Sequence, residues 1–338
     1  MKVCVLFGGL STEHDISIKS ALSVISNLDK RKYDIYPVYI DKNNNYYRCL
    51  DGIEKREIIN NIINYLKEMD VIFPALHGKY GEDGTVQGML DLIKVPYVGC
   101  GVLSSSVCMD KIYTKKLLSS SGINVAKFLF VKKIKSNYLC YDQFFNEMKC
   151  TKKELIEKIN DYLKYPVFVK ASKSGSSIGV YKSNKEKIIE NIEKSFMYDN
   201  KVLIEENIDG RELEVAVLGN DLLEVSNIGE INNNSNFYTY ESKYVDKIST
   251  SITKDIDKKI SKNIKDIAYK AYKVCDCRCL ARVDFFLDKN NNIILNEINT
   301  MPGFTSISMY PKLMIDYKYS YKKLLDKLIE LAIKNVEQ

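Results

Sequence analysis

Two carboxylates near the C-terminus, Asp284 and Glu297, are spaced as facing partners in a β-hairpin. The apolar stretches 281–287 and 293–298 flank a turn made of one aspartate, one lysine and three asparagines, which is typical of a hairpin. A hairpin centred between residues 290 and 291 places Asp284 directly opposite Glu297. Two like charges in that position destabilise a sheet, so the pair predicts a cation between them.

The ligand set of this hairpin favours magnesium. Asn299 lies two residues beyond Glu297 and therefore on the same face, and Arg282 shares that face with Asp284. Two carboxylates and an amide oxygen suit Mg²⁺ that also bridges phosphate groups of a substrate. The alternative is a solvated hairpin whose acids face water. The apolar residues that alternate with the polar ones, such as Val283 and Phe285, occupy the opposite face and favour a half-buried hairpin instead.

A candidate phosphate-binding site follows a short apolar strand that ends at Lys170. The segment 174–179 reads Ser-Gly-Ser-Ser-Ile-Gly, and small residues allow backbone N–H groups to approach a phosphate. The segment lacks the Gly-Lys-Ser/Thr ending of a P-loop, so a flexible loop is the alternative interpretation. Lys111 and Lys243 are further candidates for phosphate contacts.

Bulk composition is that of a globular protein. The chain has 338 residues, 45% of them hydrophobic and 28% charged, which predicts two or three domains. A net charge of +6, spread along the chain, suits an anionic substrate and does not require nucleic acid. No segment approaches the roughly 20 apolar residues of a membrane span, which favours a cytoplasmic protein without membrane contact.

The cysteines form no regular disulfide framework. There are nine, and three of them alternate in Cys-Asp-Cys-Arg-Cys at 275–279. A zinc site is the alternative interpretation, but the chain has only two histidines, His14 and His77, as further ligands. Unpaired thiols are typical of proteins in a reducing cytosol.

The first ninety-odd residues alternate between strand-like and helix-like patterns. This βαβ order predicts a parallel sheet covered by helices, with ligands bound beyond the carboxyl ends of its strands. The Gly8-Gly9 turn and the His77 loop both lie at such ends. The predicted strands are 3–7, 36–40 and 71–76, and the predicted helices are 15–28 and 57–68.

The rest of the chain mixes helices and strands in no simple alternation, so the fold class is α/β followed by α+β. We expect three units: residues 1–95, 96–180 and 181–338. The second is predicted to hold helices 111–120 and 152–163 and strand 167–170. The third is predicted to hold strands 202–206 and 212–218, helix 255–274, the hairpin 281–298 and helix 321–333.

Taken together in this order, the motifs resemble the D-alanine–D-alanine ligase family of the ATP-grasp superfamily. The resemblance spans nearly the whole chain, and the two most specific stretches are His77–Gly84 and Asn296–Ser306. It implies an N-terminal parallel α/β domain followed by a two-domain ATP-grasp fold. The other matching segments are Gly8–His14, Met109–Lys111, Gly175–Gly179, Tyr240–Tyr244 and Arg282–Asp284.

The resemblance also implies a site. ATP would lie between the second and third units, with two Mg²⁺ ions, replaceable by Mn²⁺, on Asp284, Glu297 and Asn299. The implied nucleotide contacts are Lys111, Lys170, Ser177, Glu205, Glu206, Ile208, Glu212, Lys243 and Asn296. The residues implied around two D-alanine molecules are Glu13, Ser176, Tyr244, Arg282, Gly303 and Ser308. The segment 232–244 would be a lid over them.

The activity implied is the ATP-dependent joining of two D-alanines through a D-alanyl phosphate, for peptidoglycan precursors, by a cytoplasmic enzyme that forms a homodimer as many relatives do. Met309 stands where dipeptide-forming relatives usually have leucine and D-alanyl–D-serine ligases tend to have arginine. Its apolar side chain favours D-alanine as second substrate, and the D-serine ligase is the alternative. A nucleotide-binding regulator without chemistry is a third hypothesis.

Overall fold

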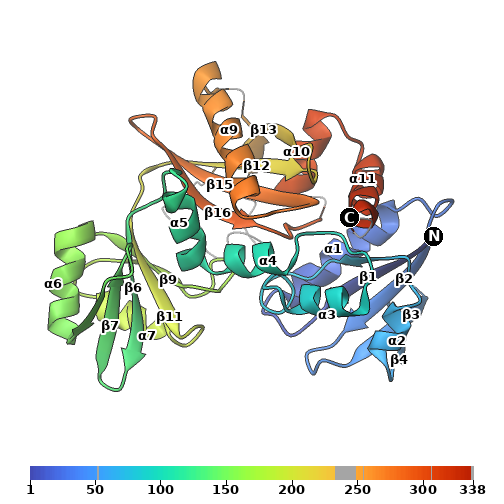
Figure 1. Ribbon diagram of the computed structural model, residues 1–338, viewed down its shortest axis with the longest axis horizontal. Coiled ribbons are helices and arrows are strands. Elements are labelled where there is room, and N and C mark those ends of the chain that lie inside the picture. Colours follow the sequence, from blue (N-terminus) through green and yellow to red (C-terminus); the bar gives the residue numbers. More distant parts are fainter. Residues whose placement is uncertain (52, 233–248, 254, 306, 336–338) are drawn as a thin grey trace.

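The computed structural model describes residues 1–51, 53–232, 249–253, 255–305 and 307–335. Its strands form three sheets (Figure 1). The first has the order β4-β3-β2-β1-β5. Its interior strand β1 is buried from its second residue on and runs parallel to β2 and β5, as the sequence predicts. The strands are β1 (Lys2–Gly8), β2 (Asp34–Ile40), β3 (Tyr46–Asp51), β4 (Lys55–Ile58) and β5 (Val71–Pro74).

The predicted helix 57–68 is wrong. The segment begins inside β4, which adds an antiparallel edge to the sheet, and only α2 (Ile62–Leu66) is helical. Asn61 ends the extended segment because its side chain accepts a hydrogen bond from the Asn64 N–H at 3.0 Å and so starts the helix there. Glu57 instead pairs with Arg48 across the strands.

Helices cover both faces of the first sheet. α1 (His14–Asn27) and α11 (Tyr321–Lys334) pack on one side, so the C-terminal helix lies against the N-terminal sheet (Figure 1). The Ser23 and Tyr321 hydroxyls lie 3.0 Å apart, and Lys32 bonds Asp326 at 2.6 Å. α3 (Thr85–Ile93) packs on the other side.

The second sheet is wholly antiparallel, with the order β10-β9-β11-β6-β7-β8. Helices α6 (Lys152–Leu163) and α7 (Ile188–Ser195) pack their apolar sides against it. Helices α4 (Val102–Met109) and α5 (Lys111–Ser120) join it to the first sheet. The strands are β6 (Phe128–Ile134), β7 (Asn137–Asp142), β8 (Glu147–Cys150), β9 (Val167–Ala171), β10 (Val180–Ser183) and β11 (Lys201–Glu206).

The third sheet, ordered β14-β13-β12-β15-β16, carries the hairpin. α9 (Lys258–Val274) packs on one face and α10 (Met309–Tyr317) on the other. The strands are β12 (Gly210–Leu218), β13 (Glu224–Asn232), β14 (Ser249–Ile252), β15 (Leu280–Asp288) and β16 (Ile293–Asn299).

Strand pairing suggests unit boundaries that differ from the expected ones. β10 and β11, which lie beyond residue 180, pair with β9 in the second sheet, and the third sheet begins only at Gly210. Tyr97 still forms a parallel bridge to Ile72 of the first sheet. We therefore propose that the first unit extends to about residue 100, and that the second ends between Glu206 and Gly210.

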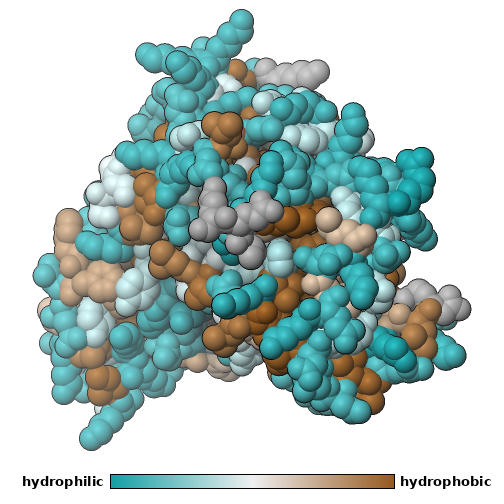
Figure 2. Space-filling view, turned by 45° about the vertical axis from the view of Figure 1, so that its right-hand side comes forward, coloured by the Kyte–Doolittle hydropathy of each residue, from teal (hydrophilic) through white to brown (hydrophobic). Residues whose placement is uncertain are grey.

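Within the described residues, no helix combines the length and the apolar character needed to cross a bilayer. Hydrophilic residues cover most of the face shown in Figure 2, with hydrophobic residues in smaller groups between them.

Candidate active site

A cleft of about 1070 Å³ is lined by residues from all three sheets. The loops after β1 and β5 contribute Glu13 and His77, the second sheet contributes Lys170, and the hairpin contributes Asp284 and Glu297. Every predicted site residue that the structure describes lines this cleft. Lys243 and Tyr244 lie outside the described residues, as does most of the predicted lid. The other predicted residues in the lining are Lys111, Ser176, Ser177, Glu205, Glu206, Ile208, Glu212, Arg282, Asn296, Asn299, Gly303 and Ser308.

The hairpin has the register that brings the two acids together. Asp284 faces Glu297, and Arg282 faces Asn299. Nearer the turn the pairing differs, because Phe285 faces Leu295, which centres the turn on residue 290 rather than between 290 and 291. An irregularity between Asp284 and Phe285 absorbs the extra residue. The predicted pair is confirmed, and the predicted centre of the turn is corrected.

A third carboxylate extends this pair into a row across the sheet. Glu214 of β12 faces Asp284 from the other side, and both side chains are buried. The Arg282 Nε lies 3.2 Å from a Glu214 oxygen, and its guanidinium donates to both Asp284 oxygens at 2.8 and 2.7 Å. A partly buried arginine thus offsets part of the charge of the acids.

The oxygen ligands of the hairpin fit a magnesium ion whose coordination shell is completed by a substrate. Among the described residues, no three or more His, Cys, Asp and Glu side chains are arranged to enclose a metal. Mg²⁺ commonly takes one or two carboxylates and completes its shell with water and phosphate oxygens. Asn299 donates its amide N–H to Asp284 at 2.9 Å, which leaves its amide oxygen as a third protein ligand.

Two lysines face the hairpin across the cleft. The Lys111 Nζ donates to the Ser174 carbonyl at 2.7 Å and lies 3.8 Å from a Glu297 oxygen. Lys170 forms an ion pair with Glu205. These contacts place two ammonium groups opposite the acids, as phosphate binding requires.

Glu205 anchors Lys170 rather than pointing freely into the cleft. It is buried at the end of β11, between Lys170 and Lys115 of α5, whose Nζ lies 2.8 Å away. Burial alone would raise the pKa of Glu205. The charges of the two lysines outweigh this effect and lower the pKa to about 2. The neighbouring Glu206 accepts a hydrogen bond from the Lys127 backbone at 2.8 Å.

At the far end of the cleft, Glu13 lies between two glycine-containing loops. The Ser176 hydroxyl donates to its Oε1. A Cβ at Gly78 would lie 2.6 Å from the Glu13 Oε2, and a Cβ at Gly175 would lie 2.7 Å from it. Both loops can approach the carboxylate this closely only because these positions carry no side chain.

Glu82 and His77 surround the same carboxylate. The Gly78 N–H donates to the Glu82 Oε2 at 2.6 Å. Burial, together with the charge of Glu13, raises the pKa of Glu82 to about 8. The His77 Nδ1 lies 3.1 Å from the Met301 carbonyl, which can only accept, so Nδ1 carries the proton. Burial lowers the pKa of His77, so its ring is neutral.

The segment that follows β16 also lines the cleft. The Ser308 hydroxyl accepts from the Thr305 N–H at 3.0 Å. A Cβ at Gly303 would lie 2.8 Å from the Ser308 Oγ, so these two predicted residues are neighbours. Met309 is buried and also lines the cleft.

Sequence reasoning missed three charged residues of the site: Lys115, Glu82 and Glu214. Glu82 stands inside a recognised motif, and Glu214 lies two residues after Glu212, so alternation along one strand was an available signal. Lys115 carried no signal, because its partner Glu205 is distant in the chain.

The fold is that of an ATP-grasp ligase. A family model described as "D-ala D-ala ligase N-terminus" matches residues 2–100, and one described as "D-ala D-ala ligase C-terminus" matches residues 117–330. The chain therefore belongs to the D-alanine–D-alanine ligase family, and both the predicted family and the predicted fold class are confirmed.

Relatives and solved structures agree with this assignment. A D-alanine–D-alanine ligase from Caldicellulosiruptor bescii is 45% identical, over 100% of this chain and 96% of its own. One from Clostridium acetobutylicum is 44% identical, over 98% and 97%. The D-alanine–D-alanine ligase structure from Coxiella burnetii has a TM-score of 0.83 at 33% identity, covering 100% and 95%. A D-Ala:D-Ser ligase structure from Enterococcus faecalis has a TM-score of 0.84 at 35% identity, covering 98% and 99%.

Proposed function

We propose that this chain joins two D-alanine molecules into D-alanyl-D-alanine, with ATP converted to ADP and phosphate, as a cytoplasmic step toward peptidoglycan precursors. One observation carries the proposal. A single cleft holds a hairpin with two facing carboxylates, two lysines near it, and a buried glutamate at its far end. The names of the relatives support the choice of amino acid.

ATP binding is proposed for the part of the cleft between the second and third sheets. Lys111 and Lys170 would bind phosphate oxygens, and the backbone of the segment 174–179 would add N–H donors. The strand end Glu205–Ile208, with Glu212, would hold the adenosine, and Asn296 would lie beside the phosphates. Because Glu205 is engaged by two lysines, its side chain would act by holding Lys170 in place.

Mg²⁺ would be held by Asp284, Glu297 and Asn299 in two positions, and Mn²⁺ would substitute for it. When bound, it supplies charge stabilisation to the phosphate oxygens. The chain adds a positive charge of its own there, because the Lys111 Nζ lies 3.8 Å from a Glu297 oxygen.

The first D-alanine would place its ammonium group at Glu13, which Ser176 orients by hydrogen bonding. Its carboxylate would then attack the γ-phosphorus of ATP and form an acyl phosphate, with ADP leaving. The amine of the second D-alanine would attack the acyl carbon and release phosphate. Arg282 and the Gly303 N–H would stabilise the oxyanion of the tetrahedral intermediate. Lys243 and Tyr244 are proposed to complete the site from the lid.

Ser308 and Met309 would define the second substrate's position. The D-serine alternative is not favoured, because the curated relatives at 44–45% identity are named D-alanine–D-alanine ligases. The burial of Met309 in the cleft wall supports a methyl over a hydroxymethyl side chain, since an unpaired hydroxyl is costly there.

Phosphate release from ATP tests the proposal. We expect release that depends on D-alanine, and a product with the mass of the dipeptide. With D-alanine and D-serine together, D-alanyl-D-alanine should remain the main product. Predominant D-alanyl-D-serine would favour the serine ligase, and nucleotide binding without any D-alanine-dependent release would favour the regulator.

A further inference from the structure

A buried polar cluster lies where the start of α5 meets the second sheet. Its members are Asp110, Ser172 and Lys201, and all three are buried. Asp110 directly precedes α5, Ser172 directly follows β9, and Lys201 is the first residue of β11. None of the three lines the large cleft, and the proposed function uses none of them.

Ser172 is bonded to each of the segments that meet at this cluster. Its hydroxyl donates to the Asp110 Oδ1 at 2.6 Å, and its backbone N–H donates to the Lys201 carbonyl at 3.1 Å. Its own carbonyl accepts from the Lys111 N–H, also at 3.1 Å. One fully buried serine therefore holds the end of β9 against the start of α5 and the start of β11.

Asp110 can accept these bonds because a cation balances its charge. Lys201 forms a buried ion pair with the Asp110 Oδ2, and the centre of the Tyr113 ring lies 4.6 Å from the same ammonium group. The other oxygen, Oδ1, also accepts from the Ile112 N–H at 3.2 Å, which caps α5. The geometry is well defined, since losing a partner such as Ser172 would leave a buried acceptor short of a donor.

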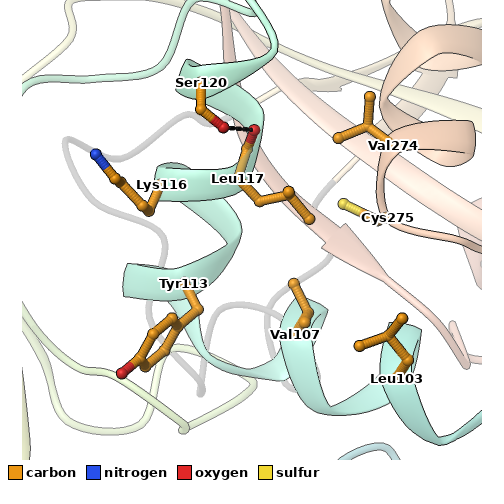
Figure 3. A pocket seen from close by; sticks show the side chains of 8 residues that line it. All are labelled: Leu103, Val107, Tyr113, Lys116, Leu117, Ser120, Val274 and Cys275. Atoms are coloured by element: carbon orange, nitrogen blue, oxygen red, sulfur yellow. Dashed lines mark hydrogen bonds between the residues drawn. The ribbon is translucent and has the colours of Figure 1, made fainter.

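The side of α5 that faces α9 gives the helix less support. A cavity of about 430 Å³ lies between α4, α5 and α9. Figure 3 shows Leu117 of α5 directed toward Val274 and Cys275 across this cavity. Packing on that side leaves α5 room to shift, so the first turn of the helix depends on Ser172 and Asp110 for its position.

We propose that Ser172 is a positioning residue for Lys111 in nucleotide binding, an inference that rests on the proposed nucleotide site. Lys111 is the first residue of α5, and its Nζ donates to the Ser174 carbonyl at 2.7 Å. Ser172 fixes both partners of this contact, because it bonds the Lys111 backbone and stands two residues before Ser174. The ammonium group and the N–H donors of the segment 174–179 thus meet the phosphates already ordered, which strengthens binding.

Nucleotide binding without D-alanine tests the role of the hydroxyl. The probe is the β,γ-imido analogue of ATP with Mg²⁺, titrated into the full chain by calorimetry, and thermal melts check that each variant is folded. Ser172→Ala removes the hydroxyl with little change in volume, so Kd should rise at least about fivefold. Ser172→Cys keeps a weaker donor and should give an intermediate Kd. Ser183→Ala is the control and should bind like wild type, because the Ser183 hydroxyl is buried in β10 of the same sheet but bonds outside the cleft.

A second background tests whether Ser172 acts through Lys111. Lys111→Gln alone should weaken binding, and adding Ser172→Ala to it should change Kd by less than about twofold. A role in general stability would instead cost the same factor in both backgrounds. The inference is overturned if Ser172→Ala binds the analogue like wild type, or if its effect is undiminished in Lys111→Gln. No binding by wild type would overturn the proposed nucleotide site itself.

Discussion

At the scale of residues, Arg282 shows both the reach and the limit of sequence reasoning. Alternation along one strand predicts that it shares a face with Asp284, and the two side chains do form a two-pronged pair. Its second partner, Glu214, follows from the pairing of β12 with β15, which joins segments far apart in the chain. No local pattern specifies that pairing.

Replacing Arg282 tests its proposed part in stabilising the oxyanion. Arg282→Lys keeps a cation beside the buried acids but loses the planar guanidinium with its two parallel N–H donors. Turnover should therefore fall by about 100-fold, with KM for ATP nearly unchanged. Arg211→Lys is the matched control, since Arg211 forms a similar two-pronged pair with Glu230 outside the cleft. Equal turnover of Arg282→Lys and wild type in steady-state assays would remove Arg282 from the mechanism.

Glu82 gives a pH prediction. Its pKa is raised from 4.5 to about 8, so between these values the folded protein holds a proton that the unfolded chain releases. The contribution of Glu82 to stability therefore falls as pH rises from about 4.5 to about 8. Glu82→Gln keeps the acceptor for the Gly78 N–H and should flatten this part of the profile, measured as Tm against pH. Parallel profiles for the two proteins would contradict the assignment.

At the scale of elements, the hairpin was predictable because its two strands are adjacent in sequence and end in a polar turn. The facing of Asp284 and Glu297 was right, but the irregularity beside Asp284, where Asn296 is the extra residue of β16, was not foreseen. The predicted helix 57–68 failed because an edge strand took its first residues. Most strands of the second sheet carried no comparable local signal.

The hairpin's proposed cation site is tested by titration. Glu297→Gln removes one anionic ligand, so the Mg²⁺ concentration for half-maximal turnover should rise at least about 10-fold. Asp288→Asn in the same hairpin keeps the Oδ1 that accepts from the Asn290 and Asn292 backbone N–H groups and should titrate like wild type. Chelation should abolish turnover in all three proteins. An unaltered Mg²⁺ requirement in Glu297→Gln would exclude Glu297 as a ligand.

The approach of two loops to Glu13 gives a second prediction at this scale. The added methyl of Gly175→Ala would lie 2.7 Å from the carboxylate and displace it, so KM for the first D-alanine should rise about 10-fold or more while ATP binding is retained. Gly88→Ala is the control, because its nearest contact would be 3.9 Å away. Identical D-alanine kinetics in the two variants would argue against Glu13 as the ammonium site.

At the scale of the whole molecule, the cleft exists only because three sheets contribute to it. The motifs alone indicated the family to which the chain belongs, because their order along the sequence can be recognised without any three-dimensional contact. The limits of the units were less predictable, because β10 and β11 return to the second sheet after the Ser-rich loop. Likewise, α11 covers the N-terminal sheet through contacts such as Lys32 to Asp326, which link opposite ends of the chain.

The central claim is that this cleft activates a D-alanine carboxylate with the γ-phosphate of ATP and then joins it to a second D-alanine. Transfer of ¹⁸O tests it most directly, using D-alanine labelled in both carboxylate oxygens and mass spectrometry of the products. We predict one ¹⁸O atom in each phosphate released and one ¹⁸O lost from each dipeptide formed. Unlabelled phosphate, released while ATP is consumed and dipeptide accumulates, would contradict the account.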